Sequence, residues 1–349
     1  MPEAFVSVRP RIKVKGELRD DLGEALRGLS LALPQHGVAH GELHAVHWGT
    51  AADDRGEPDY QLMDIELGDE VEVLMDHEER ELSLFKGEIT ALEERYGDGA
   101  PHVAILVQDR LHRLARMRAS RTFEDQSPDD LVSRIASDGG LSPDANVSTV
   151  TATWHQVNES HLAFLLRVLA PFGVPLRLRG NDLRARPEEP DGEPVALSVS
   201  DNALSVRLIA DLNHQPTESA VLGFDPGADS ELSASANAAS DPADGTTAKD
   251  RLSSLGWPGV ERVPQPFPWK QGLADAYAQA HFDRRARAFV SGEIRCVGDP
   301  RLAGGREVEL SGTSSRLTGR YRVVQCVHRF DSADGFRTGL RVARADWGA

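Results

Sequence analysis

The segment Leu62-Met-Asp-Ile-Glu-Leu-Gly-Asp-Glu-Val-Glu-Val-Leu-Met75 indicates the fold class of this chain. Apolar and acidic residues alternate on both sides of Gly68-Asp69, and a period of two is typical of a strand with one buried face. Gly and Asp are also favoured in tight turns. The segment therefore predicts two short strands, 62–67 and 71–75, joined by a turn.

The same alternation continues on both sides of this segment. Further short strands, separated by turns rich in Gly and Asp, are predicted at Ser7–Lys15, Leu82–Phe85, Gly87–Glu93 and His102–Val107. Many short strands at regular spacing are typical of an antiparallel barrel or sandwich. We therefore expect a first β domain over residues 1–115.

Helical patterns replace the alternation between residues 116 and 194. Ser127 is a predicted N-cap, with Pro128 at the first helical position and Asp129 and Asp130 at the positive end of the helix dipole. Gly139-Gly140 ends this helix.

A second helix is predicted from 158–160 to 171–173, and a hairpin turned by Gly180-Asn-Asp182 joins 174–179 to 183–186. This part of the chain, 116–194, is predicted to be a small α+β domain.

Strands return after Val195, and the predicted second β domain combines 195–225 with 290–349. Its strands are predicted at Ala196–Val199, Ser205–Asp211, Gly292–Val297, Arg306–Leu310, Gly319–His328 and Phe336–Val342. The insert 226–289 begins with an Ala-, Ser- and Asp-rich stretch, Asp225 to Asp250, interpreted as a flexible loop. It ends with a predicted helix, 273–290, on which Ala274, Tyr277, Ala278, His281 and Phe282 share a face.

Charge and length limit the class of protein. The chain has 349 residues, 55 acidic against 39 basic side chains and a formal charge of −16. Two or three domains are expected at this length. An acidic surface is a poor partner for phosphates, so we expect no stable binding of nucleic acid. No segment has the about 18 apolar residues of a membrane helix or the apolar centre of a signal peptide, so we expect cytoplasmic synthesis and no membrane insertion of the isolated chain.

Motifs for enzymes and cofactors are missing from the sequence. Gly304-Gly305 lacks the Lys-Ser/Thr of a phosphate loop and is interpreted as a hairpin turn. Ser311–Ser315 is interpreted as a Ser-rich turn, because no G-x-S-x-G occurs. Cys296 and Cys326 are expected to be buried free thiols. We assign no catalytic, cofactor-binding or metal-binding residue.

Four histidines, His36, His40, His44 and His47, are the best metal candidates in the sequence. On a strand, consecutive members of the first three would lie about 13 Å apart, too far for one ion, and the glycines between them disfavour a helix. Solvated or edge-strand histidines are the favoured interpretation, and the sequence leaves a metal there open. The carboxylate pairs Glu93-Glu94 and Glu188-Glu189 are interpreted as solvated, because neighbours on a strand point to opposite faces.

A single basic cluster follows the last strand of the first β domain. Its members are Arg110, His112, Arg113, Arg116, Arg118 and Arg121. One interpretation is an interaction or nucleic-acid patch. The favoured one is a strip of ion pairs between domains or subunits, because no aromatic stacking platform is interleaved.

The order of motifs carries a resemblance to a known family. Gly68-Asp-Glu-Val-Glu-Val73 and Leu84-Phe-Lys-Gly-Glu-Ile-Thr90 come first, and Val107-Gln-Asp-Arg-Leu-His-Arg-Leu114 follows. The helix starts at Arg121–Val132 and Asn158–Leu169 come next, and Gly319-Arg-Tyr-Arg-Val-Val-Gln-Cys-Val-His328 closes the series. Over residues 5–345 the chain resembles the phage late control gene D protein family, the tail-hub relatives of the valine–glycine repeat spike proteins of type VI secretion.

This resemblance implies a fold and a function. The fold is mainly β with an α+β insert, with two tube-like antiparallel β-barrel domains per chain, and three chains form a trimer with a pseudo-six-fold ring. The implied function is a baseplate hub of a contractile injection system or phage tail that adapts a hexameric tail tube to a trimeric spike. Because the sequence stops after the hub, a separate spike protein is expected on one end, the tube protein on the other, and other baseplate proteins around them.

Two other classes of protein remain as alternatives. One is a tail-associated, cell-wall-degrading hydrolase, which would need a carboxylate pair or a metal site. The other is a secreted β-rich binding module, for which the tryptophans are too scattered along the chain, at Trp48, Trp154, Trp257, Trp269 and Trp347. The resemblance implies assembly in the bacterial cytoplasm into a virion or injection particle, and the sequence does not separate these two.

Overall fold

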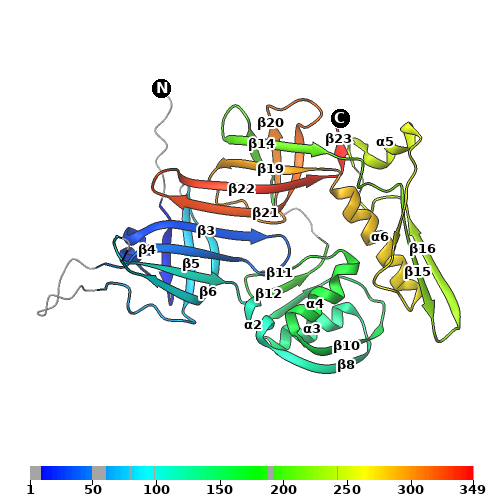
Figure 1. Cartoon of the computed structure of the whole chain (residues 1–349), viewed down its shortest axis with the longest axis horizontal. Helices are drawn as coiled ribbons and strands as arrows, with labels where there is room; N and C mark the ends of the chain where they lie inside the picture. Colours follow the sequence, from blue (N-terminus) through cyan, green and yellow to red (C-terminus); the bar gives the residue numbers. More distant parts are fainter. Residues whose placement is uncertain are drawn as a thin grey trace, which may run out of the picture.

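The structure is a computed structural model that describes residues 9–48, 60–78, 80–97, 99–187, 192–241 and 243–348. One large sheet of thirteen strands runs through most of the molecule (Figure 1). All its pairings are antiparallel except that of β13 with β20. The prediction of a mainly β chain with antiparallel sheets is confirmed.

The first β region contains the strands of residues 11–108, in the order β2-β1-β5-β6-β7-β4-β3. These strands are β1 (Arg11–Val14), β2 (Glu17–Leu18), β3 (Leu26–Pro34), β4 (His40–Val46), β5 (Glu70–His77), β6 (Arg80–Arg95) and β7 (His102–Gln108). Their inward side chains form one apolar core, in which Ile12, Leu31 and Leu43 have no exposed surface. A short helix, α1 (Asp20–Ala25), adds Leu22 to this core.

The second β region is built from both ends of the C-terminal half of the chain. Its strands are β13 (Val195–Ser198), β14 (Ala203–Ala210), β19 (Val290–Val297), β20 (Glu307–Ser311), β21 (Gly319–Asp331) and β22 (Gly335–Arg344). A separate core forms here around Ile294, Val308, Tyr321 and Val323. Two short strands, β17 (Thr246–Thr247) and β23 (Asp346–Trp347), and the helix α5 (Ala248–Leu255) lie beside it.

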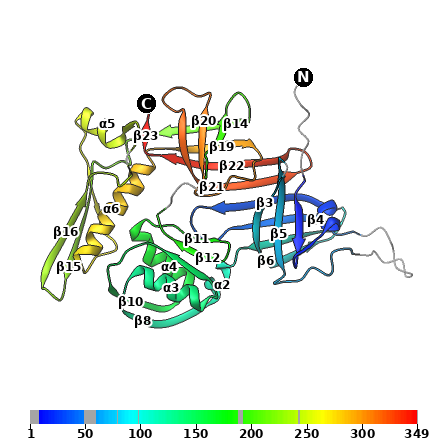
Figure 2. The same cartoon turned by 180° about the vertical axis from the view of Figure 1, so that it is seen from behind.

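The two β regions are joined by the pairing of β21 with β3. Residues 325–331 lie opposite residues 28–34, with Val327 facing Ala32. Because β21 has 13 residues, it spans both cores: Tyr321 packs in the second and Phe330 in the first. Both views show the two β regions side by side (Figures 1 and 2).

The α+β region lies between β7 and β13 in the sequence. Its elements are α2 (Leu111–Arg116), β8 (Arg118–Gln126), α3 (Pro128–Asp138), β9 (Ser142–Ala145), β10 (Ala152–Ser160), α4 (His161–Leu169), the 3-10 turn η1 (Ala170–Phe172), β11 (Leu176–Arg179) and β12 (Asp182–Ala185). The predicted cap of α3 is confirmed: the Ser127 hydroxyl accepts the Asp130 N–H at 3.2 Å, and the Asp130 carboxylate accepts the Ser127 N–H at 2.9 Å. The second helix and the hairpin turn at Gly180 are also present as predicted, and the Ser160 hydroxyl caps this helix by accepting the Ala163 N–H.

The segment predicted as a flexible loop, 225–250, is the clearest error of the sequence analysis. It contains β16 (Ser230–Ala236), which pairs with β15 (Glu218–Asp225), and β15 also pairs with β18 (Val260–Val263). Leu232 and Ala236 are buried on the face that meets the helix α6 (Gln271–Arg287). Small Ala and Ser side chains allow a strand to approach a helix closely, so a composition typical of loops forms a strand once a helix covers it.

This group of β15, β16, β18 and α6, which we call the arm, packs on the α+β region. Leu273, Tyr277 and Phe282 of α6 belong to the α+β core, and the rings of Phe172 and Tyr277 meet edge-to-face at 5.2 Å. Figures 1 and 2 show the arm at the end of the molecule opposite the first β region. Among the helices described, none is long and apolar enough to cross a membrane.

Two elements of the first β region differ from the prediction. Residues 62–67 form turns rather than a strand, because Leu62 and Ile65 are the buried positions and a spacing of three is that of a turn. β3 and β4 were not predicted. For the first predicted strand, Ser7–Lys15, the structure has β1, and residues 7 and 8 lie outside the described ranges.

Candidate functional site

The basic cluster predicted from the sequence lies where β7 passes into α2. Asp109 turns the chain between these elements: its Oδ1 accepts the Leu111 N–H at 2.9 Å and its Oδ2 accepts the Ala39 N–H at 2.8 Å. An aspartate that binds the backbone two residues on is a common way to close a turn. Asp109 therefore ties the start of α2 to the start of β4.

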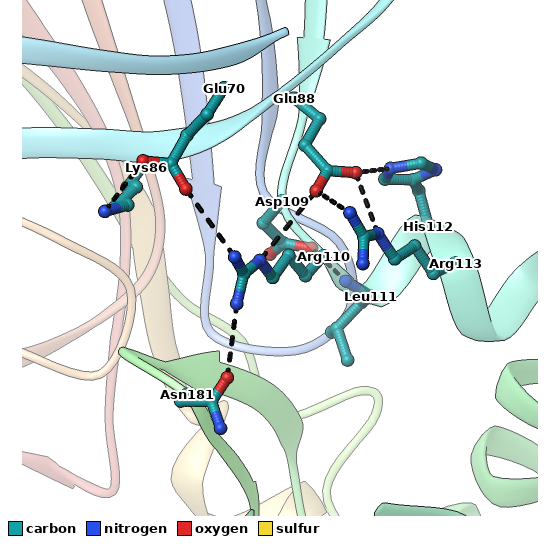
Figure 3. Close-up of polar contacts among 9 residues, drawn as sticks. All are labelled: Glu70, Lys86, Glu88, Asp109, Arg110, Leu111, His112, Arg113 and Asn181. Atoms are coloured by element: carbon teal, nitrogen blue, oxygen red, sulfur yellow. Dashed lines mark hydrogen bonds and ion pairs between the residues drawn. The ribbon is translucent and has the colours of Figure 1, made fainter. Parts of the chain in front are cut away.

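Glu88 of β6 is the centre of the charged contacts that follow (Figure 3). The Arg113 Nε donates to Glu88 Oε2 at 3.0 Å, the Arg113 Nη2 donates to Glu88 Oε1, and the His112 Nε2 lies 2.8 Å from Glu88 Oε2. Arg110 adds an ion pair, with its Nε 3.8 Å from Glu88 Oε1. Three cationic or potentially cationic side chains thus share one carboxylate that is only 7% exposed.

Arg110 extends this arrangement to a second carboxylate and to the α+β region. Its Nη2 lies 3.5 Å from Glu70 Oε2, and Lys86 pairs with the other Glu70 oxygen at 3.0 Å. Its Nη1 donates to Asn181 Oδ1 at 3.3 Å, and Asn181 lies in the turn between β11 and β12. We call Glu70, Lys86, Glu88, Asp109, Arg110, His112, Arg113 and Asn181 the junction cluster.

Burial and charge act on the two inner carboxylates of the junction cluster in opposite ways. Burial alone would raise the pKa of Glu88, but the hydrogen bonds from Arg113 and His112 outweigh it and hold that pKa below its ordinary value. Asp109 has no such cation in contact. Burial raises the pKa of Asp109 to about 6, although the backbone N–H groups of Ala39 and Leu111 act against it. The junction cluster is therefore a set of ion pairs between the first β region and the α+β region.

The rest of the basic cluster lies at the end of α2 and along β8. Arg121 pairs with Asp138 at 2.7 Å, and its guanidinium lies 4.7 Å from the centre of the Phe123 ring. Arg118 donates to the Asn158 carbonyl at 2.7 Å. Within the described residues, Arg116 has no hydrogen bond or ion pair. The favoured interpretation, a strip of ion pairs between domains, is confirmed for Arg110 and Arg113, which pair with Glu88 of β6, whereas Arg121 pairs with Asp138 inside the α+β region.

The four histidines predicted as metal candidates each have a different partner. His36 Nδ1 accepts the Leu176 N–H at 2.9 Å, His40 Nδ1 lies 3.1 Å from the Val38 carbonyl, His44 pairs with Glu42, and His47 stacks on Tyr60 at 5.2 Å. Burial lowers the pKa of His36. In the ranges that the structure describes, no three His, Cys, Asp or Glu side chains are grouped as a metal site would require.

The other sequence candidates have structural partners. Glu93 pairs with Arg95 at 2.8 Å, whereas Glu188-Glu189 lie outside the described residues. Gly304-Gly305 forms a turn, but the predicted hairpin is wrong, because the flanking strands β19 and β20 pair with other strands and not with each other. A Cβ at Gly304 would clash with the Gln35 nitrogen, so this glycine allows the second β region to touch the end of β3. The Ser311 hydroxyl at the end of β20 donates to the Leu197 carbonyl at 3.3 Å.

Two buried polar groups were not found from the sequence. In the second β region, His328 Nδ1 lies 3.0 Å from the Thr338 hydroxyl, and its Nε2 lies 2.9 Å from the Leu302 carbonyl. Cys326 lies beside it, with Sγ 3.4 Å from Nε2. Both cysteines are buried and free, as predicted. Burial lowers the pKa of His328 to about 4, so the imidazole is neutral at pH 7.

The second buried polar group lies in the arm and consists of Ser219, His281 and Glu261. The Ser219 hydroxyl lies 3.0 Å from His281 Nδ1, and His281 Nε2 lies 3.6 Å from Glu261. The order of these groups is that of a hydrolase triad, and the Ser219 side chain has no exposed surface in this arrangement. Their separation in the sequence, across three elements, leaves no local motif from which to predict the contact. The contacts among Ser219, His281 and Glu261 instead hold α6 against β15 and β18.

Comparisons with solved structures show which known proteins have a similar fold. The 43 kDa tail protein of prophage MuSo2 from Shewanella oneidensis has a TM-score of 0.70 at 13% identity, over 97% of this chain and 99% of that one. The tail protein of Neisseria meningitidis has a TM-score of 0.66 at 12% identity, over 97% of each chain. A type VI secretion component of Escherichia coli has a TM-score of 0.54 at 11% identity, over 97% of this chain and 78% of that one.

Sequence comparison gives one assignment. No curated protein sequence matches the chain significantly. A protein-family model described as the Alg8 N-terminal domain matches residues 60–332, which is more than half of the chain. The match runs from the first β region through the α+β region and the arm to the end of β21. The chain belongs to the Alg8 N-terminal domain family and has the fold of phage tail proteins.

Proposed function

We propose that this chain is a structural hub protein of a phage tail or of a phage-derived contractile injection machine. In this role it adapts a hexameric tail tube to a trimeric spike and acts by assembly, without catalysis. Support comes from the likeness of the fold to two tail proteins along 97% of the chain. Its place of action is then a virion or an injection particle.

The observation that carries the proposal is the joining of two β regions in one sheet by β21 and β3. Each region is an antiparallel sheet around its own apolar core, and we propose that each is a tube-like barrel. Three copies of a chain with two such regions would present six of them. A three-fold assembly could then match a six-fold tube on one face and a three-fold spike on the other.

The proposed spike partner is supported by two longer relatives in structure. The Escherichia coli type VI component is described as similar to the tail proteins gp27 and gp5 of bacteriophage T4. A chain of the Francisella PdpA–VgrG complex has a TM-score of 0.51 at 11% identity, and this chain spans 58% of it. We infer that the present chain supplies the hub part of such an assembly and contacts a spike.

The junction cluster has a mechanical part in this proposal. A hub transmits load between its tube-facing and spike-facing parts, so the β regions and the α+β region should keep one relative orientation. Glu88, Arg110 and Asn181 connect the first β region to α2 and to the β11–β12 turn. Multiple charge-assisted hydrogen bonds to one carboxylate are directional and suit this purpose.

The experiment that tests the proposal is a mass measurement of the assembled complex. The chain and the spike protein encoded beside it are purified, mixed and measured by native mass spectrometry, and the expected complex contains three copies of each. Complexes with one copy of each at every concentration would contradict the proposal. The neighbouring genes separate the two settings: capsid and terminase genes indicate a phage, whereas an ATPase and cargo genes without a capsid indicate an injection machine.

A further inference from the structure

A pocket of about 480 Å³ lies at the C-terminal end of β14, beside β23 and α5. Its apolar wall is formed by Leu212, Phe289 and Trp347, and Arg251 and Arg316 stand at its rim. The rings of Phe289 and Trp347 stack at 6.4 Å with an angle of 24° between their planes. The pocket therefore has a rigid aromatic surface of the kind that receives an apolar side chain.

The rim of this pocket carries positive charge without a counter-charge. Among the residues described, the Arg251 and Arg316 side chains form no hydrogen bond or ion pair, and Arg316 only lies over the Trp347 ring, 5.8 Å from its centre. Two arginines that line one pocket without an ion pair among the described residues are unexpected in a chain of net charge −16. Guanidinium groups near an aromatic wall favour a ligand that joins an apolar group to a carboxylate.

The carboxylates next to the pocket in the sequence have partners of their own. Asp211 accepts from His214 Nδ1 at 2.9 Å and from the Asn213 N–H at 2.8 Å. Asp346 accepts from Arg344 at 2.6 Å and from the Gly245 N–H at 2.9 Å. Among the described residues neither acid forms a hydrogen bond or ion pair with Arg251 or Arg316, so the guanidinium N–H groups remain available to an external anion.

The free edge of β14 ends at this pocket, so an extended peptide paired with β14 would reach it. It is the end strand of the main sheet and pairs with β19 and with no other described strand. Its outward residue Ile209 is 60% exposed, and its last residue, Ala210, lines the pocket. An exposed apolar edge strand is a template for pairing with an extended peptide.

The positive charge of the two arginines determines whether such a peptide would run parallel or antiparallel to β14. A strand added parallel to β14 would bring its C-terminal carboxylate to the arginines. An antiparallel strand would bring an N-terminal ammonium group there, which the arginines repel. We propose that β14 and this pocket bind the C-terminal segment of a partner protein, parallel to β14, with its last apolar side chain against Phe289 and Trp347 and its carboxylate between Arg251 and Arg316.

The proposal is tested with fluorescent hexapeptides and the whole chain. The probes are Thr-Val-Thr-Val-Thr-X with a fluorescein on the N-terminal nitrogen, in which X is each amino acid in turn, each with a free carboxylate and as the C-terminal amide. Fluorescence anisotropy should show tightest binding when X is Leu, Ile, Phe or Trp. The free carboxylates should bind about tenfold or more tightly than the amides, as expected for a charge-assisted contact.

The double variant Arg251→Gln with Arg316→Gln should lose the preference for the carboxylate. Arg116→Gln is the matched control, because Arg116 is also an exposed, unpaired arginine but lies on α2. Circular dichroism should show unchanged folding for all three proteins. Equal binding of acids and amides, no preference for apolar X, or unchanged binding by the double variant would overturn the proposal.

Two further outcomes would also overturn it. If 4-phenylbutyrate competes as strongly as the best peptide, the pocket binds a small aromatic acid and pairing with the β14 edge does not contribute to binding. If sedimentation velocity shows that the double variant changes the oligomeric state of the chain alone, this face is covered by a second copy. The proposal does not rest on the hub function, since the peptide measurement uses the chain alone and its failure would leave a three-fold complex with the spike unaffected.

Discussion

The two β regions share one sheet but place their ionisable groups differently. In the first region the core is apolar, and the buried carboxylates Glu88 and Asp109 lie at its border with the α+β region. In the second region His328, Thr338 and the two cysteines lie in the interior. The first region thus uses buried charge to attach a neighbour, and the second uses neutral polar groups to connect its own strands.

This difference should give the two regions opposite responses to pH. His328 titrates at 6.5 in an unfolded chain and at about 4 in the fold. Between these values the unfolded state binds a proton that the folded state does not, so the stability from His328 falls as the pH falls from 6.5 to about 4. Asp109 has a raised pKa, from 3.8 to about 6, so its stability contribution falls as the pH rises through that window.

The largest expected effect comes from His328→Leu. Leucine fills much of the space but leaves the Leu302 carbonyl and the Thr338 hydroxyl without their imidazole partner, which should reduce the free energy of unfolding by about 3 kcal/mol at pH 7. The protein with His328 should itself lose on the order of 3 kcal/mol between pH 6.5 and pH 4 through this group, so the two proteins should converge in acid. Urea unfolding at several pH values measures both.

The control for this variant is His214→Leu, at a histidine whose side chain is 74% exposed. It should change the unfolding midpoint little at any pH. A constant difference between the His328→Leu protein and the unmodified protein from pH 7 to pH 4 would contradict the assignment of His328 as a neutral, buried group.

A smaller effect is expected from Glu88→Gln at the junction cluster. The amide keeps the length of the side chain but removes the charge that Arg110 and Arg113 share, and the expected loss of stability is about 1–3 kcal/mol. Hydrogen exchange should show the loss first at the amides of α2, since this helix depends on Glu88. Exchange that accelerates evenly over the chain would contradict a local role at the junction.

Glu93→Gln is the matched control, because Glu93 lies on the same strand and pairs with Arg95 in solvent. The exchange rates of α2 should not change in this variant. The comparison of Glu88 with Glu93 separates the effect of a buried junction from that of an exposed ion pair.

The smallest effect is expected from Asp109→Asn. An amide has one carbonyl oxygen, so either Ala39 or Leu111 loses the acceptor of its N–H group, at a cost of about 1 kcal/mol. The difference from the unmodified protein should be largest below pH 3.8 and should shrink as the pH rises to about 6, where the buried carboxylate becomes charged. Urea midpoints measure it, with the exposed Asp201→Asn as control. A difference that grows from pH 4.5 to pH 7 would show that the sign is wrong.

Local signals in the sequence predicted the elements that depend on neighbouring residues. The cap of α3 at Ser127, the end of the second helix near Gly173 and the hairpin at Gly180 follow from turn and cap chemistry within a few residues. The same kind of reasoning failed at 225–250, because β16 is a strand only where α6 covers its small residues. The same reasoning also failed at 62–67, where apolar and acidic residues alternate in a segment that forms turns.

The sequence by itself determined the class of the protein: a mainly β, acidic chain whose basic cluster is a strip of ion pairs. Only the tertiary structure decided which acids those arginines meet, since Glu88 lies on β6, Arg110 precedes α2 and Asn181 comes from another region. It also decided that β21 pairs with β3, nearly 300 residues away, and that Arg251 and Arg316 share a pocket. Caps and turns are set by chain geometry over a few residues, whereas these contacts depend on how sheets and helices pack.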